Sequence, residues 1–170
     1  MLRVGIARVV VAKKQRRIGG VPEGYDAFLL SQSAHKAVVP LVHICRDDVR
    51  LDMLSKALAF FAPELGVAAF PAWDCLPYDR VSPITEITAR RLATLKSLTN
   101  KTNLPKIVLT TVNAITQRIP PRSFIQRSTM RIAVGETVDR DALIQFFVRN
   151  GYLHAETVRE TGEYAIRGGI

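Results

Sequence analysis

The feature that most constrains the fold is an alternation of short apolar runs with longer segments of helical periodicity. Residues 38–44, 66–71 and 106–112 are apolar, and each run predicts a buried strand. Between these runs, residues 49–61 and 85–98 repeat apolar side chains at helical spacing. Because parallel strands need long crossover connections, which are usually helices, this order predicts an α/β domain with a parallel sheet, flanking helices and right-handed crossovers.

The alternation stops at the proline pair Pro120-Pro121. Beyond it, the sequence predicts an edge strand at residues 128–134 and a helix at residues 139–150. It then predicts an antiparallel pair formed by residues 152–158 and 163–170, joined by a turn at Glu160-Thr161-Gly162. This change of pattern indicates a second, smaller α+β unit.

A change of composition accompanies the change of pattern, because every cation from Arg118 onward is arginine. We therefore divide the chain into a basic N-terminal leader at residues 1–20, a first domain at residues 21–120 and a second domain at residues 121–170. The last predicted strand stops at Ile170 with no partner after it. We expect the second domain to be truncated and the chain to be a fragment.

The overall composition excludes several classes of protein. Hydrophobic residues make up 48% of the chain and charged residues 23%, which is too apolar for global disorder. The longest apolar runs, such as residues 57–62, are far shorter than the ~18 residues of a membrane span. The two cysteines, Cys45 and Cys75, make no disulfide framework, and the three histidines lack ligand spacing. We predict a cytoplasmic protein with no metal, no catalytic residue and no membrane partner.

Positive charge is concentrated at the N-terminus. The net charge is +9, and the first twenty residues hold six basic side chains and no acidic one. A solvated leader is the preferred interpretation of this stretch. A phosphate-contacting arm that would bind DNA directly is the alternative.

A glycine-containing segment precedes the first predicted helix, where a phosphate-binding loop would lie. A working loop needs a lysine followed by serine or threonine, and residues 20–27 contain neither that lysine nor that pair. They contain Glu23 and Asp26 instead, which would repel phosphate. We interpret the segment as a degenerate, non-functional nucleotide loop that includes Gly20, Gly24 and Tyr25.

The most distinctive segment follows the second predicted strand. Residues 70–83 contain the only tryptophan of the chain together with several prolines. An aromatic loop at the carboxyl end of a strand is placed to stack on a base or a partner through Trp73, Tyr78 and Arg80. A proline-stiffened cap over the sheet end is the preferred alternative.

The same segment resembles a known family. Residues 70–83 read Phe-Pro-x-Trp-Asp-x-Leu-Pro-Tyr-Asp-x-x-Ser-Pro, which resembles the N-terminal region of the bacterial transcription-repair coupling factors, the Mfd family. Three further stretches agree in order, at residues 86–95, 111–120 and 162–168. The last of these also resembles a hairpin strand of the excision-repair protein UvrB. The resemblance extends over residues 18–170.

The resemblance implies a fold and a function. In the family, this region copies UvrB: a helicase-like, RecA-like sheet with a degenerate P-loop is followed by a domain that binds UvrA. It implies a module that recruits UvrA to stalled RNA polymerase in nucleotide excision repair. The ATP- and magnesium-dependent DNA translocase and the contacts to RNA polymerase and double-stranded DNA lie downstream in the family. We therefore expect no cofactor and no enzymatic activity in this chain.

The resemblance also implies the residues that contact UvrA. UvrB-like sequences often carry Arg-x-Arg-Gly in the hairpin strand, whereas this chain has Ala165-Ile166-Arg167-Gly168. Arg167 is then the main candidate, beside Gly168 and Glu163, and Arg159 is a candidate for a second positive charge. Strand alternation predicts that Arg167 faces outward. The same alternation predicts that Tyr164 and Ile166 pack inward against the preceding helix, on Leu143, Phe146 and Phe147.

Two other classes of function stay open at this point. One is an autonomous NTP-dependent DNA helicase or translocase, which the missing lysine of residues 20–27 disfavours. The other is a module that binds DNA directly through its basic surface.

Overall fold

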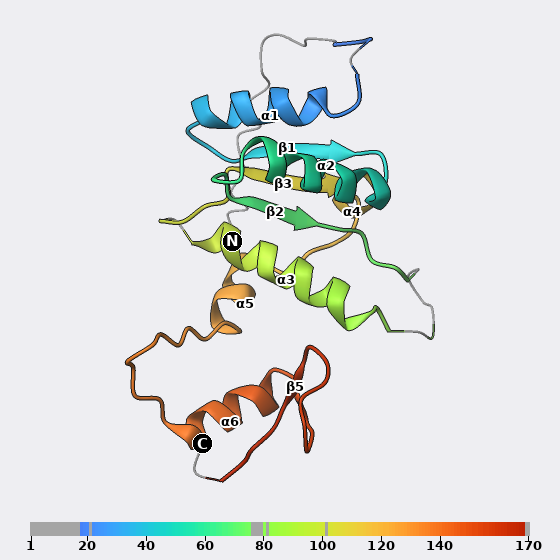
Figure 1. Cartoon of the computed structure of the whole chain (residues 1–170). Helices are drawn as coiled ribbons and strands as arrows, with labels where there is room; N and C mark the ends of the chain where they lie inside the picture. Colours follow the sequence, from blue (N-terminus) through green and yellow to red (C-terminus); the bar gives the residue numbers. More distant parts are fainter. Residues whose placement is uncertain (1–17, 21, 76–79, 81, 101, 169–170) are drawn as a thin grey trace, which may run out of the picture.

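A computed structural model describes residues 18–20, 22–75, 80, 82–100 and 102–168 (Figure 1). The basic side chains of the predicted leader and Tyr78 lie outside these residues. The elements in chain order are α1 (Tyr25–Lys36), β1 (Leu41–Cys45), α2 (Asp48–Phe61), β2 (Val67–Phe70), α3 (Thr85–Thr99), β3 (Ile107–Thr111), α4 (Val112–Ile115), α5 (Arg122–Arg127), α6 (Arg140–Arg149), β4 (Leu153–His154) and β5 (Glu163–Tyr164).

The main sheet has three parallel strands in the order β1-β3-β2. The central strand pairs Ile107 with Leu41 of β1 on one side and with Val67 of β2 on the other. All five residues of β3 are buried, as expected for the central strand of a parallel sheet covered on both faces. The predicted α/β domain with parallel pairing is therefore confirmed.

Helices cover the two faces of this sheet with separate cores. On one face, α1 and α2 pack against alternate residues of β3, including Ile107 and Leu109. On the other face, Leu95 and Leu98 of α3 pack against Val108. In Figure 1, α2 crosses in front of the sheet and α3 runs below β2. The period-2 alternation of β3 thus directs successive side chains into the two cores.

Helix α2 begins where the sequence predicts, at the acidic pair after the first strand. A side-chain oxygen of Asp47 accepts a hydrogen bond from the backbone N–H of Arg50 at 2.8 Å. This bond satisfies one of the N–H groups that the first helical turn leaves unpaired.

The region after the proline pair departs from prediction in two places. The edge strand expected at residues 128–134 is absent, and helix α5 lies just before this segment. The segment runs into a turn in which Glu136 N donates to Ala133 O at 3.1 Å. No strand of the described chain lies beside it for pairing, and a strand needs such a partner.

The predicted antiparallel pair is also wrong, because β4 and β5 are two residues long each and pair in parallel. Leu153 N donates to Gly162 O and Ala155 N donates to Tyr164 O, both at 2.9 Å. After Ala155, at the end of β4, the chain runs back along the strand pair and enters β5 from Gly162, beside the start of β4, so that the two strands run in the same direction. The expected turn at Glu160-Thr161-Gly162 is present, with Glu163 N donating to Glu160 O at 3.3 Å, but it belongs to this returning loop.

No helix among the described residues is both long enough and apolar enough to cross a membrane.

Candidate partner-binding site

Residues 139–168 pack around one aromatic ring, that of Phe147 on α6. Its centroid lies 4.9 Å from the Tyr152 ring and 5.2 Å from the Tyr164 ring, and it stacks on Tyr164 at an interplanar angle of 28°. No residue of α6 is fully buried. Contacts between aromatic rings therefore form the centre of this unit. The predicted inward packing of Tyr164 against this helix is confirmed.

Arg167 is exposed, but it lies beyond β5, which ends at Tyr164, so strand alternation does not extend to it. Its Nη2 donates to Thr157 Oγ1 at 2.7 Å and to the carbonyl oxygen of Glu156 at 3.2 Å. Within the described part of the chain, no carboxylate pairs with this guanidinium, and its Nε and Nη1 make no hydrogen bond. The arrangement leaves a planar cationic fork that can pair with an external carboxylate.

The Glu163 side chain, another predicted site residue, is engaged within the chain. Its Oε2 accepts hydrogen bonds from the backbone N–H groups of Arg159 at 2.8 Å and Glu160 at 3.2 Å. These two bonds stabilise the ionised form and lower the pKa of the Glu163 carboxyl below its ordinary value. The carboxylate thus fixes the backbone at Arg159, whose own side chain is exposed.

Gly168 follows Arg167 with a φ of +57°, in the left-handed region that favours glycine. A Cβ built at this position would meet no atom of the described residues within 4 Å. Backbone conformation, rather than crowding inside the chain, is therefore what favours glycine here. The close approach of a partner at this residue stays a prediction.

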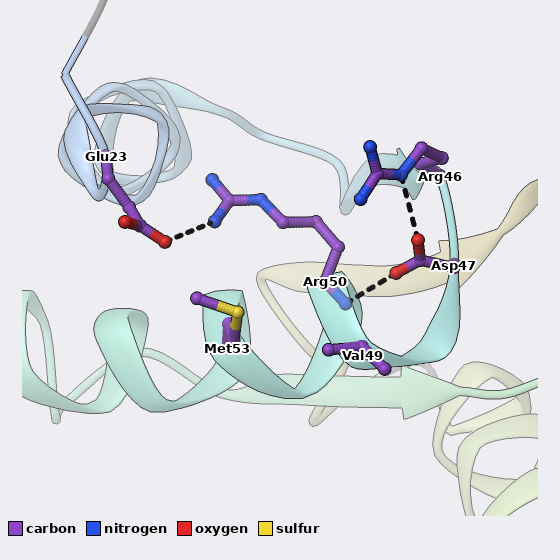
Figure 2. A pocket seen from close by; sticks show the side chains of 6 residues that line it. All are labelled: Glu23, Arg46, Asp47, Val49, Arg50 and Met53. Carbon is purple, nitrogen blue, oxygen red and sulfur yellow. Dashed lines mark hydrogen bonds and ion pairs between the residues drawn. The ribbon is translucent and has the colours of Figure 1, made fainter.

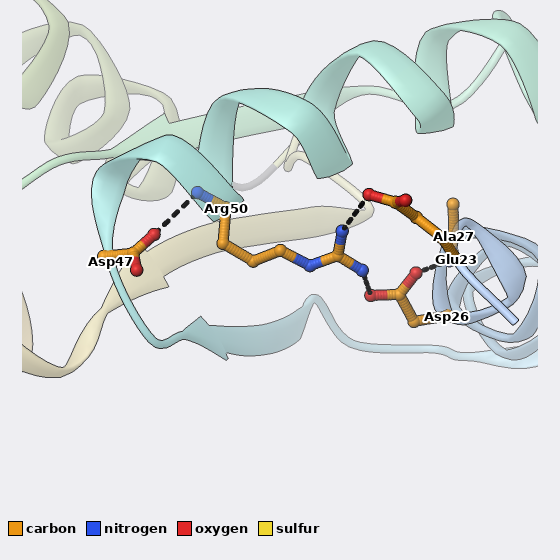
Figure 3. Close-up of polar contacts among 5 residues, drawn as sticks. All are labelled: Glu23, Asp26, Ala27, Asp47 and Arg50. Atoms are coloured by element: carbon orange, nitrogen blue, oxygen red, sulfur yellow. Dashed lines mark hydrogen bonds and ion pairs between the residues drawn. The ribbon is translucent and has the colours of Figure 1, made fainter. Parts of the chain in front are cut away.

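The predicted nucleotide loop lies in the first domain, at the start of α1. Gly24 precedes the helix with a φ of +83°, Gly20 has a φ of +66°, and Tyr25 is the first helical residue. Arg50 of α2 reaches this end of α1, where its Nη2 lies 2.6 Å from Asp26 Oδ2 and its Nη1 lies 3.6 Å from Glu23 Oε1 (Figure 3). The two acidic side chains that the sequence analysis identified as repelling phosphate are thus held in place by one arginine.

The same contacts line a shallow, open hollow between α1 and α2. Figure 2 shows Arg50 crossing it toward Glu23, while the Arg46 guanidinium bonds Asp47 at its rim. The residues that line it are Glu23, Arg46, Asp47, Val49, Arg50 and Met53. Its one cation that faces α1 is already paired with carboxylates, so the hollow presents little to attract an anion.

Trp73 lies against an arginine that the sequence analysis did not single out. Arg91 of α3 is only 2% exposed, and its guanidinium carbon lies 4.1 Å from the Phe70 ring centroid and 4.2 Å from the Trp73 ring centroid. Arg91 Nη1 donates to Pro71 O at 2.6 Å and to Gln117 Oε1 at 3.0 Å. Burial lowers the pKa of Arg91. Arg91 lies on the apolar stripe of a predicted helix, a position that permits this burial but does not require it.

This contact covers one face of the Trp73 ring and ties the loop to the sheet. The backbone N–H of Trp73 also donates to Gln117 Oε1 at 3.0 Å. The geometry therefore agrees with the preferred interpretation of a cap over the sheet end. Arg80 is exposed.

Among the described residues, the predicted UvrA-binding residues lie near one another. These residues lie in β5 or within a few residues of it: Arg159, Glu163, Arg167 and Gly168. The nucleotide-loop residues and Trp73 lie elsewhere, near the start of α1 and after β2. In the described chain, no group of three or more histidine, cysteine or acidic side chains is arranged to hold a metal ion.

Comparisons with known proteins show a family model and several relatives that are similar to this chain. Residues 130–170 match the family model of the UvrB interaction domain. The transcription-repair-coupling factor of Escherichia coli is 32% identical over 161 residues, which is 95% of this chain and 14% of that protein. The corresponding protein of Myxococcus xanthus is 34% identical over 77% of this chain and 11% of its own length, and that of Bacillus subtilis is 26% identical over 92% and 13%. The chain thus spans about one seventh of the length of the Escherichia coli relative.

Proposed function

This chain is a relative of the transcription-repair coupling factors across their N-terminal, UvrB-like region, and on that premise we propose that it recruits UvrA through residues 121–170. The observation that carries the proposal is the match of residues 130–170 to the UvrB interaction domain. Arg167 lies inside the matched region. Its exposed guanidinium is the group best suited there to bind a carboxylate of the partner.

Charge and geometry support Arg167 as the central contact. The guanidinium is planar and permanently charged, and within the described chain it has only neutral acceptors, Thr157 Oγ1 and Glu156 O. A partner carboxylate that pairs with it gains a charge-assisted hydrogen bond from Nε or Nη1. Arg159 brings a second positive charge to the same segment. We assign it a supporting role, since its exposed side chain has no described partner.

For the first domain, we infer a helicase-like sheet whose nucleotide loop no longer works. The parallel β1-β3-β2 order supports this assignment, and so does the pairing of Arg50 with Glu23 and Asp26 at the start of α1. Among the described residues, an ATP phosphate arriving there would meet two carboxylates and no free lysine. We therefore propose that this chain is not itself an ATPase, and the autonomous helicase is not favoured. Direct DNA binding has no supporting contact in the described residues.

The role of the longer protein follows as part of the same proposal. We propose that this region delivers UvrA in transcription-coupled nucleotide excision repair. The contacts to RNA polymerase and double-stranded DNA, and the ATP-driven motor, would then lie in regions that this chain does not cover. Two findings support this proposal: the relatives are named transcription-repair-coupling factors, and the chain covers only 14% and 11% of their lengths.

The experiment is a binding titration of the purified chain with UvrA, comparing the parent with Arg167→Ala. We expect the affinity to fall by about 2 kcal/mol, roughly 30-fold, with an unchanged melting temperature. Arg140→Ala removes an exposed arginine from the same unit and serves as the control for lost charge. Equal binding by the parent and Arg167→Ala would place the interface elsewhere.

A further inference from the structure

The segment that joins β4 to β5, residues 155–162, is folded by the side chain of the residue that follows it. We call this segment the β4–β5 loop. Its two ends are closed by the ladder bonds of Leu153 and Ala155. Inside it, the Glu163 carboxylate accepts from two consecutive backbone N–H groups, those of Arg159 and Glu160. One half-buried side chain thereby holds the middle of an otherwise irregular loop.

The same loop supplies both acceptors for Arg167. Thr157 Oγ1 lies 2.7 Å from Nη2 and the Glu156 carbonyl lies 3.2 Å from it. Both acceptors are neutral, so the guanidinium keeps its charge for a partner, while its Nε and Nη1 make no bond to the described residues. An arginine side chain has several rotatable bonds, and holding it at one end reduces the freedom that binding would have to remove.

We propose that Thr157 and Glu163 are positioning residues for the partner-binding arginine. Glu163 holds the β4–β5 loop in shape, and Thr157 on that loop orients the Arg167 guanidinium toward the partner. This inference rests on the proposed function, in which Arg167 contacts UvrA. It assigns to Glu163 a role inside the chain, in place of direct contact with the partner.

The test compares binding of the full 170-residue chain and its variants to purified UvrA. Thr157→Val removes the hydroxyl while keeping the side-chain shape, and we expect affinity to fall about five- to tenfold. Thr161→Val changes an exposed threonine of the same loop that makes no described hydrogen bond, and we expect no effect. Glu163→Ala should weaken binding and Glu163→Gln should weaken it less, because the amide oxygen still accepts from a backbone N–H.

A double-mutant cycle separates positioning from direct contact. If Thr157 acts through Arg167, Thr157→Val causes no further loss once Arg167→Ala is present. An equal loss with and without Arg167 would overturn the positioning role and leave the Arg167 contact standing. Full affinity of the Arg167→Ala chain would overturn both.

A second readout keeps the test decisive if Glu163→Ala disturbs folding. The Nε–Hε resonance of Arg167, recorded by NMR on the chain without UvrA, reports the order of the guanidinium directly. We expect Thr157→Val to broaden or shift that resonance and Thr161→Val to leave it in place. An unchanged resonance together with unchanged affinity in Thr157→Val would rule out the proposal.

Discussion

The guanidinium of Arg91 lies 4.2 Å from the ring of Trp73, in a site where the arginine is almost completely buried. The guanidinium carbon also lies 4.1 Å from the centroid of the Phe70 ring. No carboxylate among the described residues pairs with this cation, and its hydrogen bonds go to the neutral oxygens of Pro71 and Gln117. The aromatic faces thus provide the favourable electrostatics that a carboxylate supplies at most buried arginines.

We expect Arg91→Ala to destabilise the chain by about 2–4 kcal/mol, because it removes two cation–π contacts and leaves Pro71 O without its donor. Trp73 is the only tryptophan, so its fluorescence reports this site directly. Denaturant unfolding should give the stability change, and the emission should shift to the red. Arg91→Lys keeps the charge but loses the stacked plane, and should fall between parent and alanine. An unshifted emission in Arg91→Ala would contradict the contact.

The first-domain elements were predictable because each depends on nearby residues. The strand at Ile107–Thr111 follows from its β-branched run, and the start of α2 follows from the acidic Asp47 before a helical stripe. The burial of Arg91 was not predictable, because the same stripe position is compatible with an arginine that reaches solvent. Only the packing of α3 against Phe70 and Trp73, residues distant in sequence, decides it.

The second unit was harder to predict for a related reason. Two short apolar segments separated by a turn signal predict a hairpin, yet β4 and β5 pair in parallel. Their direction depends on the path of the β4–β5 loop, which the Glu163 carboxylate fixes through its bonds to Arg159 and Glu160. Such side-chain bonds to the backbone leave no periodicity in the sequence.

We expect Leu109→Ala to lower the free energy of unfolding by about 3 kcal/mol, since Leu109 is fully buried between β3 and the helices α1 and α2. Val42→Ala is the matched control on the neighbouring strand, because Val42 is 64% exposed. Its effect should stay below about 1 kcal/mol. Chemical denaturation measures both. Similar losses at the two positions would contradict the arrangement of the sheet.

We expect no magnesium-dependent ATP hydrolysis by this chain, because Glu23 and Asp26 occupy the start of α1 where phosphate would bind. The measurement is release of phosphate from ATP by the purified chain. Freeing the carboxylates with Arg50→Ala should still give no activity and should lower stability by about 1 kcal/mol. Turnover above background that disappears when Glu23 is changed would show that the loop works.

We expect Asp47 to make stability depend on pH in the acidic range. The backbone hydrogen bond from Arg50, and then the side-chain bond from Arg46, lower the pKa of Asp47 below its ordinary 3.8. The contribution of a carboxyl with a lowered folded pKa is fully present above the unfolded value and is lost as pH falls through the folded value. Thermal unfolding between pH 6 and pH 2 should therefore show a smaller acid-induced loss in Asp47→Asn than in the parent. An equal dependence of stability on pH in the two chains would mean that the charge of Asp47 does not contribute to the stability of the helix cap.

The last prediction distinguishes a fork-shaped contact at Arg167 from a simple positive charge. Thr157 and Glu156 hold Nη2, while Nε and Nη1, on different edges of the guanidinium, have no described partner, so a partner carboxylate meets donors in a fixed plane. Lysine keeps the charge but presents a single ammonium group. That group cannot bond Thr157 Oγ1 and Glu156 O and still extend as far toward a partner as the guanidinium does. Titration of Arg167→Lys with UvrA at two salt concentrations should therefore give a loss of about 1–2 kcal/mol at both, with a parent-like melting temperature. Screening acts on charge more than on hydrogen-bond geometry, so the loss should persist when salt is raised. Parent-like affinity of Arg167→Lys, together with weak binding by Arg167→Ala, would mean that UvrA senses only the charge and that the orientation of the guanidinium is immaterial.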